Sequence, residues 1–189
     1  MHRAAAPRAE EPLVAFLRGV NVGGKNKLPM RELVPLFEEL GCTGVLPHIQ
    51  SGNVVFRLAK GRDERGVSDA IAKAIAARFG FAAPVITRTK SELRAIVEAN
   101  PFIAERADPA TLHVGFFAHA PDARGIAALD PRRSLPDRFA VRGRELYLCL
   151  PNGVARSKLT NAYFDAKLAT TTTIRNWRTV LTVLEMADR

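Results

Sequence analysis

The residues best suited to chemistry lie in a glycine-rich segment, Gly19 to Asn26, which follows an apolar run from Leu13 to Leu17. The segment reads GVNVGGKN and is one residue away from the phosphate-binding pattern G-x-x-x-x-G-K-[ST]. In that pattern backbone N–H groups hold phosphate oxygens, the lysine neutralises them and the hydroxyl holds Mg²⁺. Here Asn26 replaces the hydroxyl residue, and no later strand ends in an Asp that could anchor the metal. We therefore interpret the segment as an anion cradle, or as a plain glycine turn, and we reject an ATPase.

Three further polar segments could contribute to the same site. Gln50 to Asn53 lies at a predicted hairpin tip, Asn152 to Lys158 follows a second hairpin, and Arg175 with Asn176 lies on the first turn of the predicted last helix. For the first of these, ordinary turn chemistry is the favoured explanation. The residues that we predict as ligand contacts are Arg18, Asn21, Lys25, Asn53, Lys158 and Arg175.

The sequence offers little for catalysis or metal binding. Ser157 and Lys158 are adjacent, so in an extended segment they point to opposite faces and cannot act as a nucleophile pair. His48 is the single candidate general base near the polar loops. The spacing of the histidines and of Cys42 and Cys149 fits no metal site. We expect no metal and no cofactor, no catalytic residue is assigned, and the question of an enzyme stays open.

Composition indicates a globular protein. Hydrophobic residues make up 47% and charged residues 25% of the 189 residues, and no stretch approaches the roughly 18 unbroken apolar residues of a membrane helix. Residues 1–12 form a predicted disordered tail without a secretion signal, so we expect a cytoplasmic protein and no membrane partner. The net charge of +9 favours acidic partners, although the arginines are scattered singly along the chain. Nucleic acid is therefore the alternative partner to a small anion, and the oligomeric state is unknown.

The hydrophobic pattern predicts an α+β fold of two similar halves. The first half, residues 13–88, reads as strand, helix, two strands, helix and strand, which is the ferredoxin-like order. Its helices are predicted from Pro29 to Gly41 and from Ser68, as N-cap, to Phe79. Both faces of the strand from Leu13 to Val20 are apolar, which predicts that both are covered.

A connecting helix and loop are predicted over residues 89–110, opened by the capping box Thr89 to Glu92. The second, related half is predicted over residues 111–189. Its central strand runs from Leu112 to Ala118, its fourth strand has only the threonine run 170–173 to draw on, and its last helix carries Ile174 and Trp177 on one face. The fold class is therefore α+β, with two ferredoxin-like subdomains packed together and a C-terminal helix.

Four blocks of the chain resemble a known family. Phe16 to Asn26 with Pro29 and Met30, Ile49 to Phe56, Ser157 to Thr160, and Thr173 to Val180 are similar, in this order, to the characteristic blocks of the bacterial domain-of-unknown-function family 1697. The resemblance implies an α+β protein of two related subdomains and implies no chemistry.

Our interpretation from sequence is a protein whose polar loops bind a small anionic ligand, phosphorylated or nucleotide-like. The alternatives are a nucleic-acid-binding module that uses a basic surface and a protein-interaction domain that uses an exposed sheet face.

Overall fold

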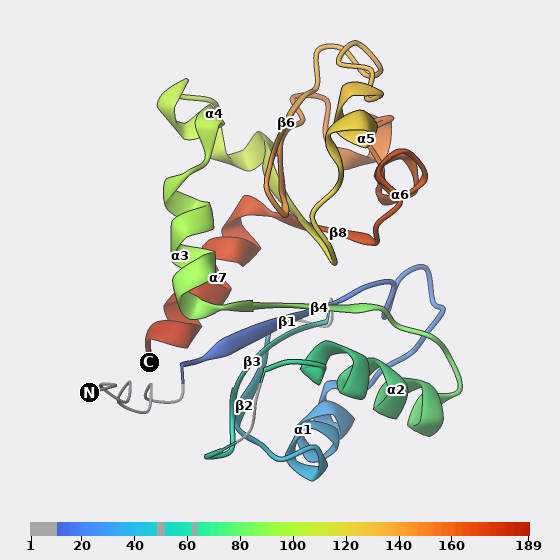
Figure 1. Cartoon of the computed structure of the whole chain (residues 1–189), viewed down its shortest axis with the longest axis vertical. Coiled ribbons are helices and arrows are strands. Elements are labelled where there is room, and N and C mark those ends of the chain that lie inside the picture. The colour runs from blue at the N-terminus through green and yellow to red at the C-terminus, as the bar shows by residue number, and fades with distance from the viewer. Residues whose placement is uncertain (1–10, 49–51, 62–63) are drawn as a thin grey trace, which may run out of the picture. The chain divides into compact units, whose positions relative to one another are not determined.

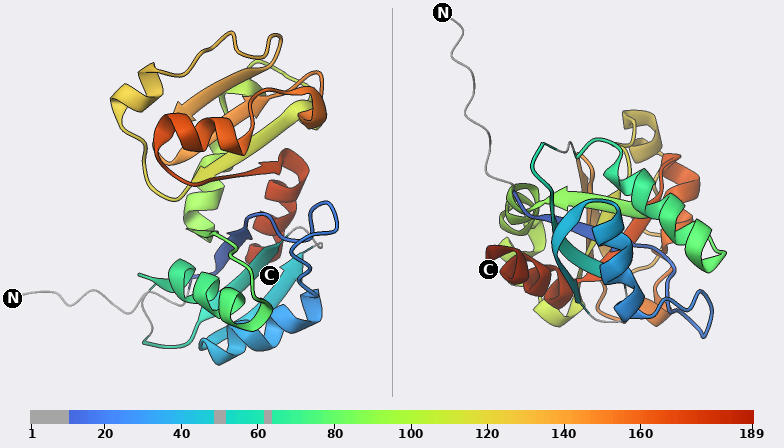
Figure 2. Two further views of the ribbon diagram at one scale, coloured as in Figure 1. Left: turned by 90° about the vertical axis from the view of Figure 1, so that its right-hand side faces the viewer. Right: turned by 90° about the horizontal axis from the view of Figure 1, so that it is seen from below.

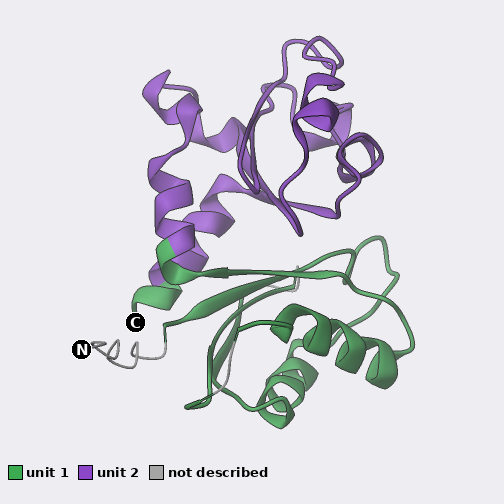
Figure 3. Ribbon diagram, in the orientation of Figure 1, with its two compact units in different colours: residues 1–91, 186–189 green, residues 92–185 purple. Residues whose placement is uncertain are grey.

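The computed structural model describes residues 11–48, 52–61 and 64–189. The chain divides into two compact units, one formed by Met1–Ser91 with Met186–Arg189 and the other by Glu92–Glu185 (Figure 3). Unit 1 is therefore made from two separate stretches of the chain. Each unit contains one four-stranded antiparallel sheet, so the protein belongs to the α+β class.

Unit 1 alternates strands and helices around its sheet (Figure 1). Its elements are β1 (Leu13–Leu17), α1 (Met30–Glu39), β2 (Cys42–His48), β3 (Asn53–Leu58), α2 (Val67–Phe79) and β4 (Val85–Thr89). The strand order is β2-β3-β1-β4, so β1 is central and pairs antiparallel with both β3 and β4. Figure 2 shows from two further sides that α1 and α2 cover the same face of this sheet.

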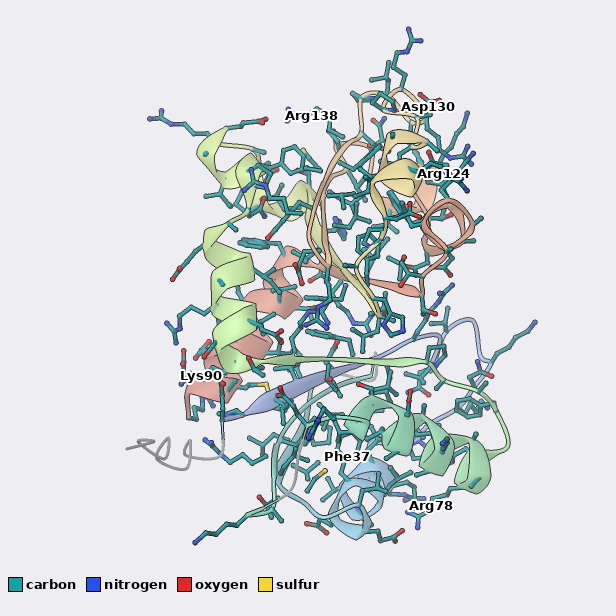
Figure 4. All side chains as sticks on the ribbon, viewed as in Figure 1. Phe37, Arg78, Lys90, Arg124, Asp130 and Arg138 are labelled. Carbon is teal, nitrogen blue, oxygen red and sulfur yellow. The ribbon has the colours of Figure 1, made fainter. Side chains whose placement is uncertain are left out.

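The core of unit 1 lies between this face and the two helices. Alternate residues of β1, namely Leu13, Ala15 and Leu17, join the apolar side chains of α1 and α2 in one buried cluster. Phe37 of α1, labelled in Figure 4, packs edge-on against Phe56 of β3 with ring centroids 5.1 Å apart. The other face of β1 is buried as well, because Val14 and Phe16 have no exposed surface. The prediction that both faces of this strand are covered is confirmed.

Two boundaries in unit 1 differ from the prediction. Ser68 is not the N-cap of α2, because the helix begins at Val67 after Gly66, and the Ser68 hydroxyl bonds Thr87 Oγ1 at 2.9 Å. Helix α1 continues through Pro35 and begins one residue after Pro29, which takes the N-cap position. Both shifts are of one or two residues and leave the buried face of each helix unchanged.

Unit 2 repeats the order of unit 1. Its elements are most of α3 (Lys90–Glu98), α4 (Pro101–Ala104), a 3₁₀ turn (Pro109–Thr111), β5 (Leu112–Phe117), α5 (Ala123–Ala127), β6 (Arg138–Arg142), β7 (Glu145–Cys149), a second 3₁₀ turn (Val154–Arg156), α6 (Asn161–Leu168), β8 (Thr172–Asn176) and most of α7 (Trp177–Asp188). The strand order β6-β7-β5-β8 places β5 at the centre, as β1 is in unit 1. The prediction that these two strands are equivalent is therefore consistent with the pairing.

The sheet of unit 2 is buried on both faces by its own helices and strands. On one face Leu146 and Leu148 of β7 join Tyr163, Phe164 and Leu168 of α6 in a buried cluster. On the other face Tyr147 of β7 donates its hydroxyl to the carbonyl of Ile96 in α3 at 3.1 Å. Helix α3 thus follows β4 in the chain and packs on the sheet of unit 2.

The end of the second half differs from the prediction. Thr172–Asn176 forms β8, so Ile174 lies in a strand opposite Gly115, and Arg175 and Asn176 do not lie on a helix. The spacing of Ile174 and Trp177 suits a helix, but the strand runs directly into α7 without a turn residue between them. Asn176 marks the true start, because its Oδ1 accepts the Thr179 N–H at 2.8 Å as an N-cap does.

Candidate functional site

The loop between β1 and α1 is a miniature hairpin. The Lys25 N–H donates to the carbonyl of Val22 at 3.0 Å, and the Asn21 N–H donates to the carbonyl of Asn26 at 3.0 Å. Gly23 and Gly24 form the two-residue turn with φ of 58° and 74°. Positive φ at both central positions is the type I′ geometry that two-residue hairpins prefer. The glycines of this segment therefore have a clear conformational reason.

Two asparagine side chains hold this hairpin in place. The Asn21 Oδ1 accepts the Leu28 N–H at 2.8 Å, and its Nδ2 donates to the carbonyl of Leu28 at 3.0 Å. The Asn26 Nδ2 donates to the carbonyl of Gly19 at 2.9 Å. Both asparagines have positive φ, 54° for Asn21 and 50° for Asn26, a conformation that asparagine tolerates better than most residues. Asn26, which occupies the hydroxyl position of the phosphate-binding pattern, is thus engaged in holding the loop.

The tip of the hairpin is exposed and basic. Lys25 and Lys27 are exposed, and neither has an acidic partner among residues 11–48, 52–61 and 64–189. Arg18, at the base of the loop, is half-buried, and its N–H donates to the carbonyl of Pro84 at 2.8 Å. The hairpin closes on itself through the N–H of Lys25, so it does not wrap a phosphate as an ATPase loop does.

The second polar segment adjoins the base of this loop. The Leu17 N–H donates to the carbonyl of Gly52 at 2.7 Å, so Arg18 lies next to the strand that begins with Asn53. Asn53 is fully buried opposite Phe16, and its Nδ2 reaches the carbonyl of His48 at 3.4 Å. Gln50 and Ser51 lie outside the described residues.

Gly52 has a packing reason of its own. A Cβ at this position would stand 2.5 Å from Val20 Cγ2 and 2.8 Å from Leu17 Cβ, and its φ is 72°. His48, the candidate general base, ends β2 opposite Asn53. Burial lowers the pKa of His48, so its imidazole is neutral at pH 7. The structure therefore brings Arg18, Asn21, Lys25 and Asn53 into one region of unit 1.

Lys158 lies in unit 2, in the loop before α6. It is exposed, and its N–H donates to Ser134 Oγ at 2.9 Å. The hydroxyl of Ser157 accepts the Leu159 N–H at 3.1 Å, which is local turn chemistry and leaves no role for a Ser–Lys nucleophile pair.

Arg175 is a half-buried residue of β8. Its Nη1 donates to Thr173 Oγ1 at 2.8 Å and to the carbonyl of Ile174 at 3.0 Å. Burial lowers the pKa of Arg175 to about 10, so the side chain keeps its charge at neutral pH. The geometry is that of a strand residue whose guanidinium bonds its own backbone.

Sequence reasoning missed a second arginine of this kind. Arg88 in β4 is 1% exposed, and its Nη1 donates to the carbonyl of Thr87 at 2.8 Å. Arg88 pairs with Val14 of β1 as Arg175 pairs with Val114 of β5. Both arginines therefore occupy the same register position beside the central strand. The available signal was an arginine close to the start of a predicted helix in both halves.

Within the part of the chain that the structure describes, no group of three or more His, Cys, Asp or Glu residues could hold a metal ion. No described helix is long and apolar enough to cross a membrane.

The comparisons with known proteins agree with this architecture. Residues 11–147 match the family described as protein of unknown function DUF1697, so the chain belongs to this family. The match includes the first two sequence blocks named above and ends before the last two. A solved structure, of the conserved bacterial protein SP0830 from Streptococcus pneumoniae, is similar to this chain with a TM-score of 0.72 and 21% identity over 95% of this chain and 99% of that one. The comparison with curated proteins gives no match.

Proposed function

We propose that the protein binds a small anionic ligand, a phosphorylated or nucleotide-like molecule, at the hairpin between β1 and α1. The observation that carries this proposal is the pair of asparagine side chains that fix the lysine-bearing tip by hydrogen bonds made within the chain itself. A loop that is already ordered loses little entropy on binding, so more of the interaction energy is available as affinity.

The charges and the backbone of the tip suit an anion. Lys25 and Lys27 supply positive charge without an acidic neighbour in the described chain, and Arg18 adds a third cation at the base. No atom lies within 4 Å of the positions that a Cβ would take at Gly23 and Gly24, so a ligand can approach this backbone closely. Asn53, at the neighbouring strand, completes the proposed contacts within unit 1. Lys158 and Arg175, the other two residues predicted as ligand contacts, lie in unit 2 and are not part of the hairpin site.

The strand order supports a finer fold assignment than the α+β class. An antiparallel sheet ordered β2-β3-β1-β4, with two helices on one face, is what a ferredoxin-like β-α-β-β-α-β unit requires, and the order in unit 2 is the same. We infer that both units are ferredoxin-like, and that the proposed site lies where the first strand leaves the sheet.

The test is a titration of the ¹⁵N-labelled protein with AMP, ATP and inorganic phosphate, followed by amide chemical shifts and calorimetry. We expect the amides of Gly23, Gly24 and Lys25 to shift. Lys25→Ala should cost about 1.5–3 kcal/mol of binding free energy, because it removes a charge-assisted contact. Asn21→Gly should weaken binding while keeping every charge, because it frees the loop.

The matched control is Lys73→Ala, which removes an exposed lysine of α2 that also lacks an acidic partner in the described residues. Equal weakening in Lys25→Ala and Lys73→Ala, with a steep loss in salt and tight binding of an RNA decamer, would support a nucleic-acid surface instead. Saturating phosphates that leave all three hairpin amides unmoved would refute the site.

A further inference from the structure

Two loops at one end of unit 2 are fastened to each other and to α6. The Arg133 Nε donates to the carbonyl of Lys158 at 3.0 Å, and the Lys158 N–H donates to Ser134 Oγ at 2.9 Å. Ser134 Oγ in turn donates to Asp137 Oδ2 at 2.8 Å. The first loop, residues 128–137, follows α5 and includes Asp130, which is labelled in Figure 4. The second loop, residues 150–160, precedes α6.

The side chain of Arg133 is held in one orientation. Its guanidinium lies 4.1 Å from the centroid of the Tyr163 ring. That ring is itself fixed, because it packs edge-on against Phe164 with centroids 5.2 Å apart and its hydroxyl accepts the Asp130 N–H at 2.9 Å. The guanidinium face lies on the Tyr163 ring, and its Nε donates to the Lys158 carbonyl. Both Nη groups therefore have no hydrogen-bond partner among the described residues.

The surface around Arg133 carries uncompensated positive charge. Arg132, Arg133, Arg156 and Lys158 are exposed, and none forms an ion pair within the described chain. Other arginines of unit 2 do have acidic partners, as Arg138 has Glu105 at 2.5 Å.

The acids of the first loop are engaged locally. Asp130 Oδ1 accepts the Arg132 N–H at 2.9 Å, and the carboxylate of Asp137 is buried beside Ser134. Asp137 Oδ1 is buried without a hydrogen-bond partner, and within the described residues no ion pair joins either carboxylate to one of the four cations.

We propose that Arg133 and Lys158 form a binding site for the phosphate group of a small phosphorylated molecule. A guanidinium with two unpartnered Nη groups can donate parallel hydrogen bonds to two phosphate oxygens, and Lys158, whose carbonyl accepts the Arg133 Nε–H, carries a second positive charge. The face of Tyr163 that could stack on a base is already covered by Arg133, which argues against a single-stranded nucleic-acid platform.

This site is separate from the proposed β1–α1 hairpin, since all of its residues lie in unit 2. One spectrum reads both sites, because their amides are distinct. The probes are inorganic phosphate, AMP, adenosine and an RNA decamer, each titrated into the full chain at low and at moderate salt.

We expect phosphate and AMP, but not adenosine, to shift the amides of residues 132–134 and 157–159. Arg133→Ala and Lys158→Ala should each weaken AMP binding at these amides about tenfold or more. Arg133→Lys should also weaken binding, because it keeps the charge but removes the bidentate donors. Since lysine preserves the charge and the long side chain, this variant distinguishes the loss of the bidentate contact from unfolding of the loop.

The matched controls are Arg124→Ala and Lys167→Ala, which remove exposed cations of α5 and α6 that form no ion pair with any residue the structure describes. They should leave the affinity unchanged. Equal weakening by all the alanine variants, or binding of the RNA without binding of AMP, would overturn the proposal in favour of a diffuse polyanion surface. Shifts confined to residues 23–25 would overturn it as well while supporting the hairpin site.

Discussion

Gly52 belongs to a polar sequence motif, but the structure explains it by packing and not by ligand binding. Its carbonyl accepts the N–H of Leu17, and its missing side chain lets the turn lie against Leu17 and Val20. The polar motif around it suggested hydrogen-bond partners for a ligand. The contact distances give the glycine a structural explanation that the sequence could not reveal, because Val20 is remote in the chain.

We predict that Gly52→Ala is strongly destabilising. The new methyl group would collide with two buried side chains, and alanine would have to adopt the left-handed φ that glycine has here. The free energy of unfolding should therefore fall by about 3 kcal/mol or more. Gly80→Ala is the matched control, because Gly80 has a similar φ of 74° with no atom within 4 Å. It should lose only about 1 kcal/mol in urea denaturation. Equal losses in the two variants would show that the contact at Gly52 is not limiting.

The second prediction at this scale concerns His113. It is 7% exposed in β5, and burial lowers its pKa, while the carbonyl of Thr111, 3.1 Å from Nδ1, opposes that shift. The unfolded imidazole takes up a proton near its ordinary value of 6.5, and the folded one takes it up only at lower pH. The stability that His113 contributes is therefore present above about pH 6.5 and is lost as the pH falls below it.

The free energy of unfolding, measured by urea denaturation between about pH 8 and pH 5, should decline less in His113→Gln than in the wild type. His119→Gln, at an exposed residue just after the same strand, should keep the wild-type decline. Parallel curves for the wild type and His113→Gln would contradict the prediction.

At the scale of elements, the hydrophobic pattern predicted helices and strands correctly where the apolar residues followed an unbroken run or a regular spacing. β1 follows from a continuous apolar run, which is buried on both faces, and the hairpins and the buried faces of α1 and α2 follow from the pattern as well. The pattern was ambiguous where β8 runs into α7, since Ile174 and Trp177 fit a helix as well as a strand end. Hydrogen bonds to β5, which are long-range, decide that boundary.

The candidate site shows the same limit. The β1–α1 loop was recognisable from its glycines, asparagines and lysines, which are contiguous. The cluster around Arg133 was not recognisable from the sequence. Arg133 and Lys158 lie 25 residues apart in the chain, and their loops meet only in the folded unit. Arginines that look scattered in the sequence therefore gather on one surface.

Asn176 provides a prediction at this scale. Its Oδ1 caps α7 through the Thr179 N–H, and the residue is exposed, so Asn176→Ala should cost about 1 kcal/mol of unfolding free energy through loss of the cap. Asn176→Asp keeps an acceptor oxygen and should retain most of the stability. The comparison is made by thermal and urea denaturation. A loss in Asn176→Asp as large as in Asn176→Ala would remove the cap as the explanation.

At the scale of the whole molecule, the two halves of the chain share their element order, including the helix that follows the last strand, although most of α3 belongs to unit 2. Helix α3 begins directly after β4, and α7 begins directly after β8. The connecting helix predicted from sequence is therefore the counterpart of the last helix. The hydrophobic pattern alone could not reveal this correspondence, because the sequence of a helix between two halves does not show which sheet the helix packs on.

The last residues of α7 are expected to stabilise unit 1. Ala187 is 2% exposed and lines a small cavity of about 190 Å³ with Val55 and Arg57, and Asp188 forms an ion pair with Lys90 at 2.9 Å. Figure 4 labels Lys90 at the start of α3. Ala187→Asp would remove a carboxylate from water beside the apolar side chain of Val55 and should cost about 2 kcal/mol or more.

Hydrogen exchange is the measurement for this prediction, because it reports each unit separately. Amides of β2 and β3 should exchange faster in Ala187→Asp, whereas Leu181→Asp, which places the same charge on an exposed position of α7, should leave them unchanged. Faster exchange in β5 and β7 with unchanged β2 and β3 would contradict the assignment of residues 186–189 to unit 1.

The composition of unit 1 from two stretches also sets the order in which the protein can be completed as it is made. A ribosome produces residues 1–91 first, then all of residues 92–185, and only afterwards residues 186–189. Domains generally begin to fold from the N-terminus during synthesis. The unit whose synthesis begins first is consequently the last to be complete. The sheet of β1 to β4 therefore lacks residues 186–189 for as long as the second unit is being synthesised. Released chains that end at residue 185 should therefore hold a complete second unit and an unfinished first one.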